Sequence, residues 1–190
     1  MRVLLIMFLL VLTACSADME TARTVEMYNA GGDMIGTAKL TEQPEGVQVK
    51  LKLEGLEAGF HGIHVHEYPK CKGPDFKSAG SHFNPEGKEH GPMNPEGAHL
   101  GDLPNILADS GGLADAELLL PKATLLDGKN SLIEGGGTSL VITAGQDDGV
   151  SQPGGDSGPR IACGVISNKD KNPGNSPTDP TMYNEKQKEK

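Results

Sequence analysis

The chain has 190 residues, and its 17 Lys+Arg against 26 Asp+Glu give a net charge of -9 and a pI near 5.1. This charge argues against nucleic acid or anionic lipid as a partner. Tryptophan is absent and aromatic residues make up 4% of the chain, whereas 26 Gly and 13 Pro favour short strands and many turns. The composition therefore argues against a helical bundle.

The N-terminal residues are typical of an export signal. Arg2 precedes an apolar run over residues 3–12, which as a helix would span about 15 Å of a hydrocarbon core of about 30 Å. Leu-Thr-Ala-Cys at 12–15 resembles the lipobox at which bacterial prolipoproteins are cut and acylated on the cysteine. A plain signal peptide that contains a cysteine is the alternative. We expect a signal peptide at 1–14 and, at 15–23, a lipidated Cys15 and linker that anchor the chain to a bacterial membrane outside the cytoplasm.

The next segments predict an all-β domain. Residues 47–54 alternate strictly between apolar and polar side chains, which indicates a half-buried strand. Similar short runs, bounded by Gly, Pro, Asn and Asp, lie at 24–30, 34–40, 60–67, 114–120, 131–134, 139–143 and 160–166. Eight short strands predict an antiparallel sandwich or barrel over residues 24–166.

Two long segments lack strand periodicity, at 68–112 and 146–159. Loops of this length in compact domains are usually functional or disordered, and most histidines of the chain lie in or beside the first. We therefore expect it to be functional. Residues 167–190 are rich in Pro, Asn and Lys and predict a flexible polar tail.

Three cysteines are present. If Cys15 is lipidated, Cys71 and Cys163 remain, and pairing is the default in an oxidising compartment. In the chain-entropy model, closing a loop of this size contributes roughly 4 to 5 kcal/mol. We expect one disulfide between them.

All six histidines fall between His61 and His99. His64 and His66 lie two residues apart in an apolar strand run, so both imidazoles share a face, within reach of one ion. Taken alone, the pair could also be two surface histidines on an exposed strand.

Further histidines and one aspartate follow in loop sequence, and they suit a closed, structural zinc site with three nitrogens and one carboxylate oxygen: His82, His90, His99 and Asp102. Metal binding would supply the folding free energy that a Gly-rich loop lacks. Solvated polar positions in a disordered segment are the alternative interpretation.

Several stretches, taken in order, resemble the signatures of the copper/zinc superoxide dismutase family. They are Gly-Phe-His-Gly-Ile-His-Val-His-Glu at 59–67, Ser-Ala-Gly-Ser-His-Phe-Asn-Pro at 78–85, His-Gly at 90–91, His-Leu-Gly-Asp-Leu at 99–103 and Gly-Pro-Arg-Ile-Ala-Cys-Gly-Val-Ile at 158–166. Several motifs in order are far more specific than any one of them. The resemblance covers about residues 24–166 and implies an eight-stranded Greek-key β-barrel with a metal loop and an electrostatic loop.

The resemblance also implies residue roles. It assigns copper to His64, His66 and His82, with His82 as the imidazolate that bridges to zinc. Zinc is then held by His82, His90, His99 and Asp102. Arg160 and His82 become the catalytic residues, with Arg160 attracting the superoxide anion; its alternative role is a surface salt bridge. Asp147 corresponds to a carboxylate hydrogen-bonded to ligands of both metals, His61 to a structural histidine, and Cys71 and Cys163 to the disulfide.

One position departs from the family pattern. Where the family has a further copper histidine, this chain has Thr143, and no histidine follows His99. A threonine hydroxyl is a poor ligand beside imidazole, so we expect a weakened copper site and a structural zinc site.

Two functions remain open. One is a superoxide dismutase, with reduced activity, that produces dioxygen and hydrogen peroxide; the other is an impaired dismutase-like zinc- and copper-binding lipoprotein. A zinc hydrolase is a weaker third possibility, since the zinc site lacks an open position.

Overall fold

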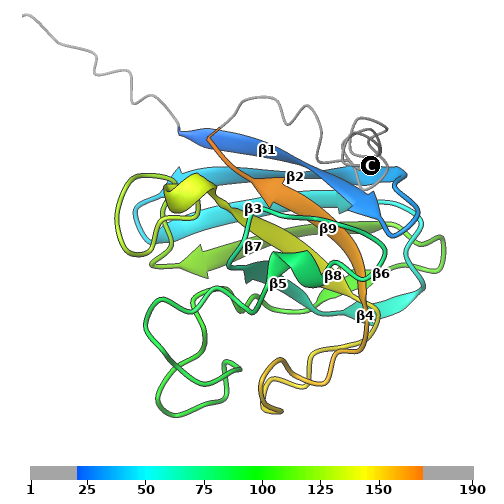
Figure 1. Cartoon of the computed structure of the whole chain (residues 1–190). Coiled ribbons are helices and arrows are strands. Elements are labelled where there is room, and N and C mark those ends of the chain that lie inside the picture. The colour runs from blue at the N-terminus through cyan, green and yellow to red at the C-terminus, as the bar shows by residue number, and fades with distance from the viewer. Residues whose placement is uncertain (1–20, 169–190) are drawn as a thin grey trace, which may run out of the picture.

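The computed structural model describes residues 21–168, and that part of the chain is almost entirely strand and loop (Figure 1). Its strands are β1 (Ala22–Asn29), β2 (Met34–Gln43), β3 (Gly46–Leu53), β4 (Gly59–His61), β5 (Ile63–His66), β6 (Ile106–Ala108), β7 (Ala114–Pro121), β8 (Thr138–Thr143) and β9 (Arg160–Ile166). The only helices among the described residues are two 3₁₀ turns, η1 (Lys77–Ala79) and η2 (Glu134–Gly136). The predicted all-β class is confirmed.

The strands form an antiparallel half-barrel. Seven pair in the order β5-β8-β9-β1-β2-β3-β7, and β4 pairs with β6 in a second, two-stranded sheet. β1 lies beside β9 and β3 beside β7, so strands distant in sequence are neighbours, as in a Greek key. The two long loops both extend below the strands in Figure 1.

The strict alternation in β3 predicts its buried face correctly. Val47, Val49, Leu51 and Leu53 are buried in the main core, whereas Lys50 and Lys52 are exposed. The core also takes side chains from the other strands, among them Val25, Met27, Leu40, Ile63, Leu120, Leu140 and Ile142. Since this core fills the inside of the half-barrel, the outer face of β5, β8 and β9 is free to carry a site.

The predicted strand over 60–67 is divided at Gly62. β4 pairs with β6 up to His61, and β5 pairs with β8 from Ile63. A Cβ on Gly62 would stand 2.5 Å from the hydroxyl oxygen of Thr143 and 3.0 Å from Cε1 of His64. Gly62 therefore lets the chain change sheets directly beneath the site.

Two sequence-based expectations about strands are wrong. Residues 131–134 form no strand, because the Ser131 hydroxyl accepts the N–H groups of Ile133 and Glu134 and starts η2. Conversely, β6 lies inside the predicted loop 68–112. It has only three residues, too few for a periodic pattern.

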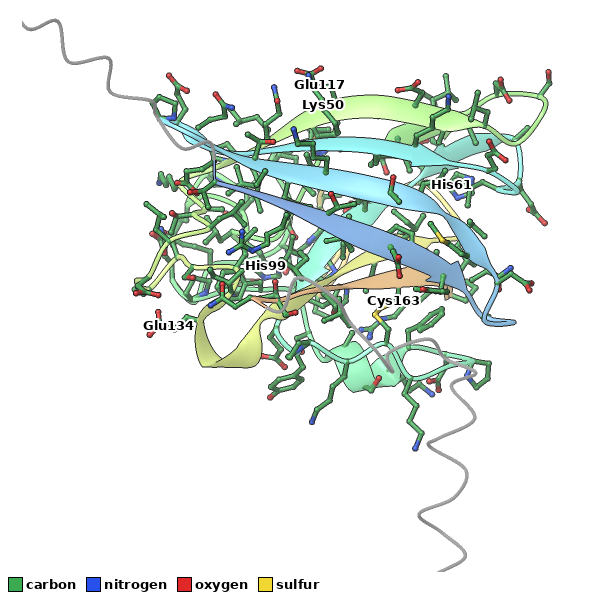
Figure 2. The ribbon with its side chains drawn as sticks, turned by 90° about the horizontal axis from the view of Figure 1, so that it is seen from above. Lys50, His61, His99, Glu117, Glu134 and Cys163 are labelled. Atoms are coloured by element: carbon green, nitrogen blue, oxygen red, sulfur yellow. A yellow bond between two sulfur atoms is a disulfide. The ribbon has the colours of Figure 1, made fainter. Side chains whose placement is uncertain are left out.

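The disulfide between Cys71 and Cys163 is confirmed, with Cα atoms 5.5 Å apart. Figure 2 shows Cys163 at the sheet, with its sulfur bonded to the segment that packs outside β9. Phe76 is fully buried in the same small outer cluster, against Val141 of β8. The cluster fixes residues 71–79 on the outer face of the sheet.

Several predicted features lie outside the described residues, namely the signal peptide at 1–14, Cys15 with most of its linker, and most of the tail at 167–190. β1 begins at Ala22, two residues before the predicted start of the domain. Within residues 21–168 there is no helix of the length and apolar character needed to cross a membrane.

Candidate metal centre

Two groups of potential ligands meet at His82. One comprises His82, His90, His99 and Asp102, and the other comprises His64, His66 and His82. Within each group the donor atoms lie within 4.8 Å of one another. His64 and His66 come from β5, whereas the rest come from the loop between β5 and β6.

The first group, here called the zinc cluster, gathers around one carboxylate. Asp102 Oδ1 lies 2.8 Å from His82 Nδ1 and 3.4 Å from His99 Nδ1, and Asp102 Oδ2 lies 3.0 Å from His90 Nδ1. All three imidazoles thus turn the same nitrogen, Nδ1, toward the carboxylate. His90 Nδ1 is buried and makes no hydrogen bond even to the nearby Asp102 Oδ2, because the ring donates through Nε2 to Asp147. A cation among these atoms would therefore be bound by a lone pair that is otherwise unsatisfied.

The second group, here called the copper cluster, presents two further buried and unpartnered nitrogens, His64 Nδ1 and His66 Nε2. The opposite nitrogen of each ring is in use: His64 Nε2 donates to Asp147 Oδ2 at 2.6 Å, and His66 Nδ1 donates to the Gly80 carbonyl at 2.9 Å. These bonds fix the tautomers and leave lone pairs on the two unpartnered atoms. The His64 and His82 rings are stacked, with centroids 4.0 Å apart.

Asp147 joins the two clusters. Its Oδ2 accepts from His64 and its Oδ1 accepts from His90 Nε2 at 3.0 Å. Asn105 holds the Asp147 backbone in both directions, since its Nδ2 donates to the Asp147 carbonyl and its Oδ1 accepts from the Asp147 N–H, each at 2.8 Å. Gly155 packs against the carboxylate, where a Cβ would overlap Asp147 Oδ1.

Burial and hydrogen bonding shift the pKa values in the directions that metal binding requires. Burial lowers the pKa of His66 to about 2 and that of His82 to about 4. Burial alone would raise the pKa of Asp102, but hydrogen bonds from His82 and His99 outweigh it, and the pKa lies well below its usual range. Burial likewise acts to raise the pKa of Asp147, and hydrogen bonds from His64, the Gly149 N–H and His90 outweigh it. The imidazoles of His66 and His82 are therefore neutral and the two carboxylates ionised, which are the forms that bind cations.

Thr143 lies beside the copper cluster but directs its hydroxyl to the backbone. Its Oγ donates to the Gly62 carbonyl at 3.2 Å, with the Gly145 carbonyl as an alternative at 3.4 Å. His61 is buried just beneath, where its two nitrogens lie 2.9 Å from the Thr143 carbonyl and 2.8 Å from the Glu57 carbonyl. With both nitrogens engaged, His61 belongs to neither cluster.

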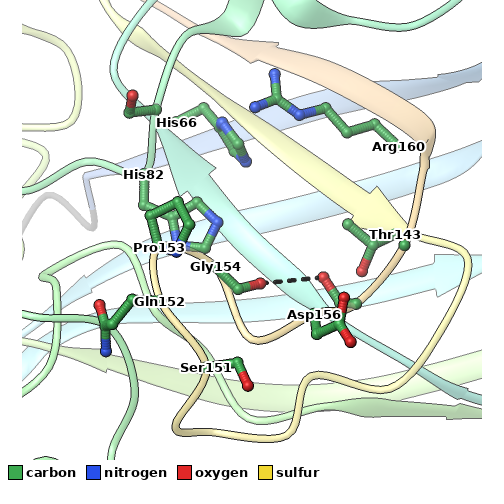
Figure 3. Close-up of a pocket in the computed structure, with 12 residues that line it drawn as sticks. His66, His82, Thr143, Ser151, Gln152, Pro153, Gly154, Asp156 and Arg160 are labelled. Carbon is green, nitrogen blue, oxygen red and sulfur yellow. Dashed lines mark hydrogen bonds between the residues drawn. The ribbon is translucent and has the colours of Figure 1, made fainter.

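A pocket of about 620 Å³ opens onto the copper cluster (Figure 3). Its lining includes His66, His82 and Thr143, with Arg160 from the start of β9. The Arg160 guanidinium is held in place by two carbonyls: Nη1 donates to Phe76 at 2.9 Å and Nη2 donates to Gly80 at 2.8 Å. Arg160 is therefore a positioned positive charge in the pocket wall, and among the described residues it forms no salt bridge with a carboxylate.

Sequence reasoning missed the residues that position the site. The Gly80 carbonyl accepts from both His66 and Arg160, and Phe76, with φ at +51°, presents its carbonyl to the same guanidinium. Gln152 links the two long loops, because its Oε1 accepts a hydrogen bond from the backbone N–H of His90 in the first loop. The position of a backbone carbonyl cannot be predicted from the residue type. Asn105, three residues after Asp102, is a polar residue that could have been considered as a partner of the site.

The donor atoms fit two cations. Three imidazole nitrogens and a carboxylate oxygen match a tetrahedral zinc site, and two further imidazoles, His64 and His66, suit copper together with the shared His82. The fold and the site thus define a half-barrel metalloprotein with two adjacent ligand clusters joined by one imidazole.

Comparison with known proteins identifies the family. The profile of the copper/zinc superoxide dismutases matches residues 34–166, and the chain belongs to that family. Superoxide dismutase [Cu-Zn] 2 of Aquifex aeolicus is 48% identical over 159 residues, which are 83% of this chain and 93% of that protein. The Caulobacter vibrioides superoxide dismutase [Cu-Zn] is 44% identical over 138 residues, or 71% of this chain and 79% of that one.

Solved structures agree on the fold. A SOD-like protein from Bacillus subtilis superimposes with a TM-score of 0.73 and 34% identity, covering 76% of this chain and 97% of that one. The Cu/Zn superoxide dismutase from Brucella abortus gives a TM-score of 0.64 at 34% identity, covering 77% and 99%.

Proposed function

We propose that the protein is a copper/zinc superoxide dismutase that acts outside the cytoplasm, with a structural zinc and a weakened copper site. Zinc is held by His82, His90, His99 and Asp102, and copper by His64, His66 and His82. The observation that carries this proposal is the pair of buried nitrogens, His64 Nδ1 and His66 Nε2, which face His82 without hydrogen-bond partners. Leaving two such groups unsatisfied is costly unless a metal binds them.

Copper held by His64, His66 and His82 would supply a one-electron redox couple, for the oxidation of one superoxide to dioxygen and the reduction of a second, with two protons, to hydrogen peroxide. The protein residues bring the anion to this centre and hold it there. Arg160, fixed by the Phe76 and Gly80 carbonyls, attracts superoxide into the pocket. Asp147 holds the His64 ring and the Gly80 carbonyl holds the His66 ring. Each ring thereby keeps one nitrogen lone pair directed at the place where copper would bind.

Thr143 sets the expected rate. A threonine side chain has no nitrogen, and the hydroxyl of Thr143 donates to the Gly62 carbonyl. The copper cluster therefore offers copper three imidazoles and no fourth ligand at this position. We expect weaker copper retention than zinc retention and slower turnover than an efficient dismutase. The same observation favours a second candidate function, a dismutase-like metal-binding lipoprotein without efficient turnover.

Metal loading and a superoxide assay of the purified protein test the proposal, alongside Thr143→His and the control Thr143→Ser. The wild type should bind zinc firmly and copper weakly and should turn over superoxide slowly. Thr143→His should raise copper affinity and activity together, whereas Thr143→Ser should change neither. Wild-type turnover near the diffusional range, about 10⁸ to 10⁹ per molar per second, with no gain in Thr143→His, would disprove the weakened site. A copper-loaded wild type no more active than free copper would leave the metal-binding function as the better explanation.

The proposed location depends on Cys15, which would carry the lipid. Replacing it in Cys15→Ser should release the protein from the membrane fraction into the soluble fraction. Cys15→Ser that remains membrane-bound would contradict the lipid anchor without affecting the metal centre.

A further inference from the structure

The loop that closes the pocket carries only negative charge. Residues 144–159 contain three aspartates and neither lysine nor arginine. Asp147 is buried and hydrogen-bonded to the histidines, and Asp148 accepts from the Ser151 hydroxyl and from two backbone N–H groups. The third, Asp156, is exposed, and its carboxylate has no hydrogen-bond or salt-bridge partner among residues 21–168.

Asp156 lines the same pocket as Arg160. Apart from the two histidines, these two are the ionisable side chains among the residues that line it. Figure 3 shows Arg160 and Asp156 on opposite sides of the pocket with Thr143 between them. An anion that approaches the copper cluster therefore meets one positive charge, held in place by two carbonyls, and one exposed negative charge.

We propose that Asp156 opposes Arg160 at the mouth of the pocket and limits the access of anions to the copper cluster. The proposal deepens the proposed function, on which it rests for the identity of the anion, superoxide. Asp156 acts through the electrostatic potential and does not touch the reacting atoms. Its effect should be strong at low ionic strength and weak above about 0.5 M salt, where the screening length falls below roughly 5 Å.

The backbone at Asp156 allows a clean substitution. Its φ is +47°, in the left-handed region that asparagine tolerates as well as aspartate does. Asp156→Asn therefore removes one charge with little change of shape. Asp115→Asn is the matched control, because Asp115 is an exposed aspartate on β7, at the opposite edge of the seven-stranded sheet from β5.

The experiment measures the potential directly on zinc-loaded protein without copper. An anionic and a cationic nitroxide with the same skeleton are added in turn, and NMR records how strongly each relaxes the amide protons of Ser157, Gly158 and Arg160. In Asp156→Asn the anionic probe should relax these protons about threefold more at low salt, since a unit charge several ångströms away in water changes the local anion concentration by a factor of this order. The cationic probe should relax them correspondingly less, and Asp115→Asn should match the wild type.

Equal probe ratios in the wild type and Asp156→Asn would overturn the proposal, as would the same change in Asp115→Asn. A second measurement links the potential to substrate. In copper-loaded protein, kcat/KM for superoxide should rise about threefold in Asp156→Asn at low salt, and the difference should vanish at high salt. If no variant turns over superoxide, the proposed function fails, while the nitroxide measurement still decides the role of Asp156.

Discussion

The zinc cluster and the copper cluster share His82 but differ in how complete they are. Around zinc, three imidazoles face one carboxylate, and loop contacts enclose the group. In the copper cluster, His66 and His82 line a pocket in which Thr143 turns its hydroxyl away toward the Gly62 carbonyl. A closed cluster is suited to holding its metal, whereas an open one is suited to reaction and loses its metal more easily. The proposed division between structural zinc and weakly held copper follows from this difference.

Zinc removal should have the largest effect. With free zinc a thousandfold above its Kd, binding stabilises the folded state by about 4 kcal/mol, and a domain of this size shifts roughly 2 to 4 °C per kcal/mol. Chelation should therefore lower Tm by about 10 °C, as followed by calorimetry. Asp102→Asn should have a Tm near that of the chelated wild type, and added zinc should raise this Tm only a little. In the control Asp109→Asn, an exposed turn residue, the response should be intact. Copper alone restoring the full Tm would erase the distinction between the clusters.

Asp147 tests the coupling of the two clusters. Asp147→Asn keeps the shape, but one of His64 and His90 loses its acceptor to an NH2 group, and the other keeps only a neutral amide oxygen in place of a carboxylate. Loss of such an orienting partner typically weakens metal binding about 10- to 100-fold. We expect both zinc and copper Kd values, measured by competition with chelators, to rise by this factor. Asp148→Asn, the exposed neighbour, should change neither; a loss confined to one metal would show that the clusters are independent.

Acid should protonate His82 and His66, two members of the copper cluster, at different pH values in metal-free protein. His66 has no carboxylate partner, and burial lowers its pKa to about 2, whereas His82 beside Asp102 has a pKa of about 4. Because both values lie below the unfolded pKa of about 6.5, the unfolded state binds more protons, and stability rises with pH. Stability should therefore fall steadily as pH drops from 6.5 toward 4, by up to about 2.5 kcal/mol per unit.

Urea unfolding of metal-free protein between pH 4 and 7 measures this dependence, and imidazole NMR identifies the residues. His82 should titrate before His66. Stability that is flat across this range, or His66 titrating near 6.5, would contradict the burial of the copper cluster.

The sequence predicted the class of fold and which residues gather at the site, for reasons that remain visible in the structure. Strict alternation in β3 identified its buried face, and the spacing of His64 and His66 placed both rings on one face of β5. The order of the family motifs grouped His82, His90, His99 and Asp102. Each of these signals depends on residues close together in the sequence, or on several such short motifs in order.

The details that sequence reasoning missed depend on contacts between distant residues. Gln152 reaches the His90 N–H across 62 positions, and Arg160 reaches the Phe76 carbonyl across 84. Whether Nδ1 or Nε2 faces a metal is decided by such contacts, because the partner occupies the other nitrogen. The direction of the Thr143 hydroxyl likewise depends on the Gly62 carbonyl, which lies 81 positions away in the break between β4 and β5.

Gly155 is one such missed residue, and it allows the smallest of these effects to be measured against a matched control. Its φ is +72°, and a Cβ there would overlap Asp147 Oδ1 and lie 2.8 Å from His90 Nε2. Gly135 has a similar φ of +65°, but a Cβ added there would meet no atom within 4 Å. Both Gly→Ala substitutions should cost roughly 1 kcal/mol for the left-handed backbone. Gly155→Ala should cost about 1 to 2 kcal/mol more, because the carboxylate must move, and should also weaken zinc binding. Equal losses of Tm in Gly155→Ala and Gly135→Ala, with unchanged zinc affinity, would mean that Asp147 is free to shift and does not hold the two clusters together.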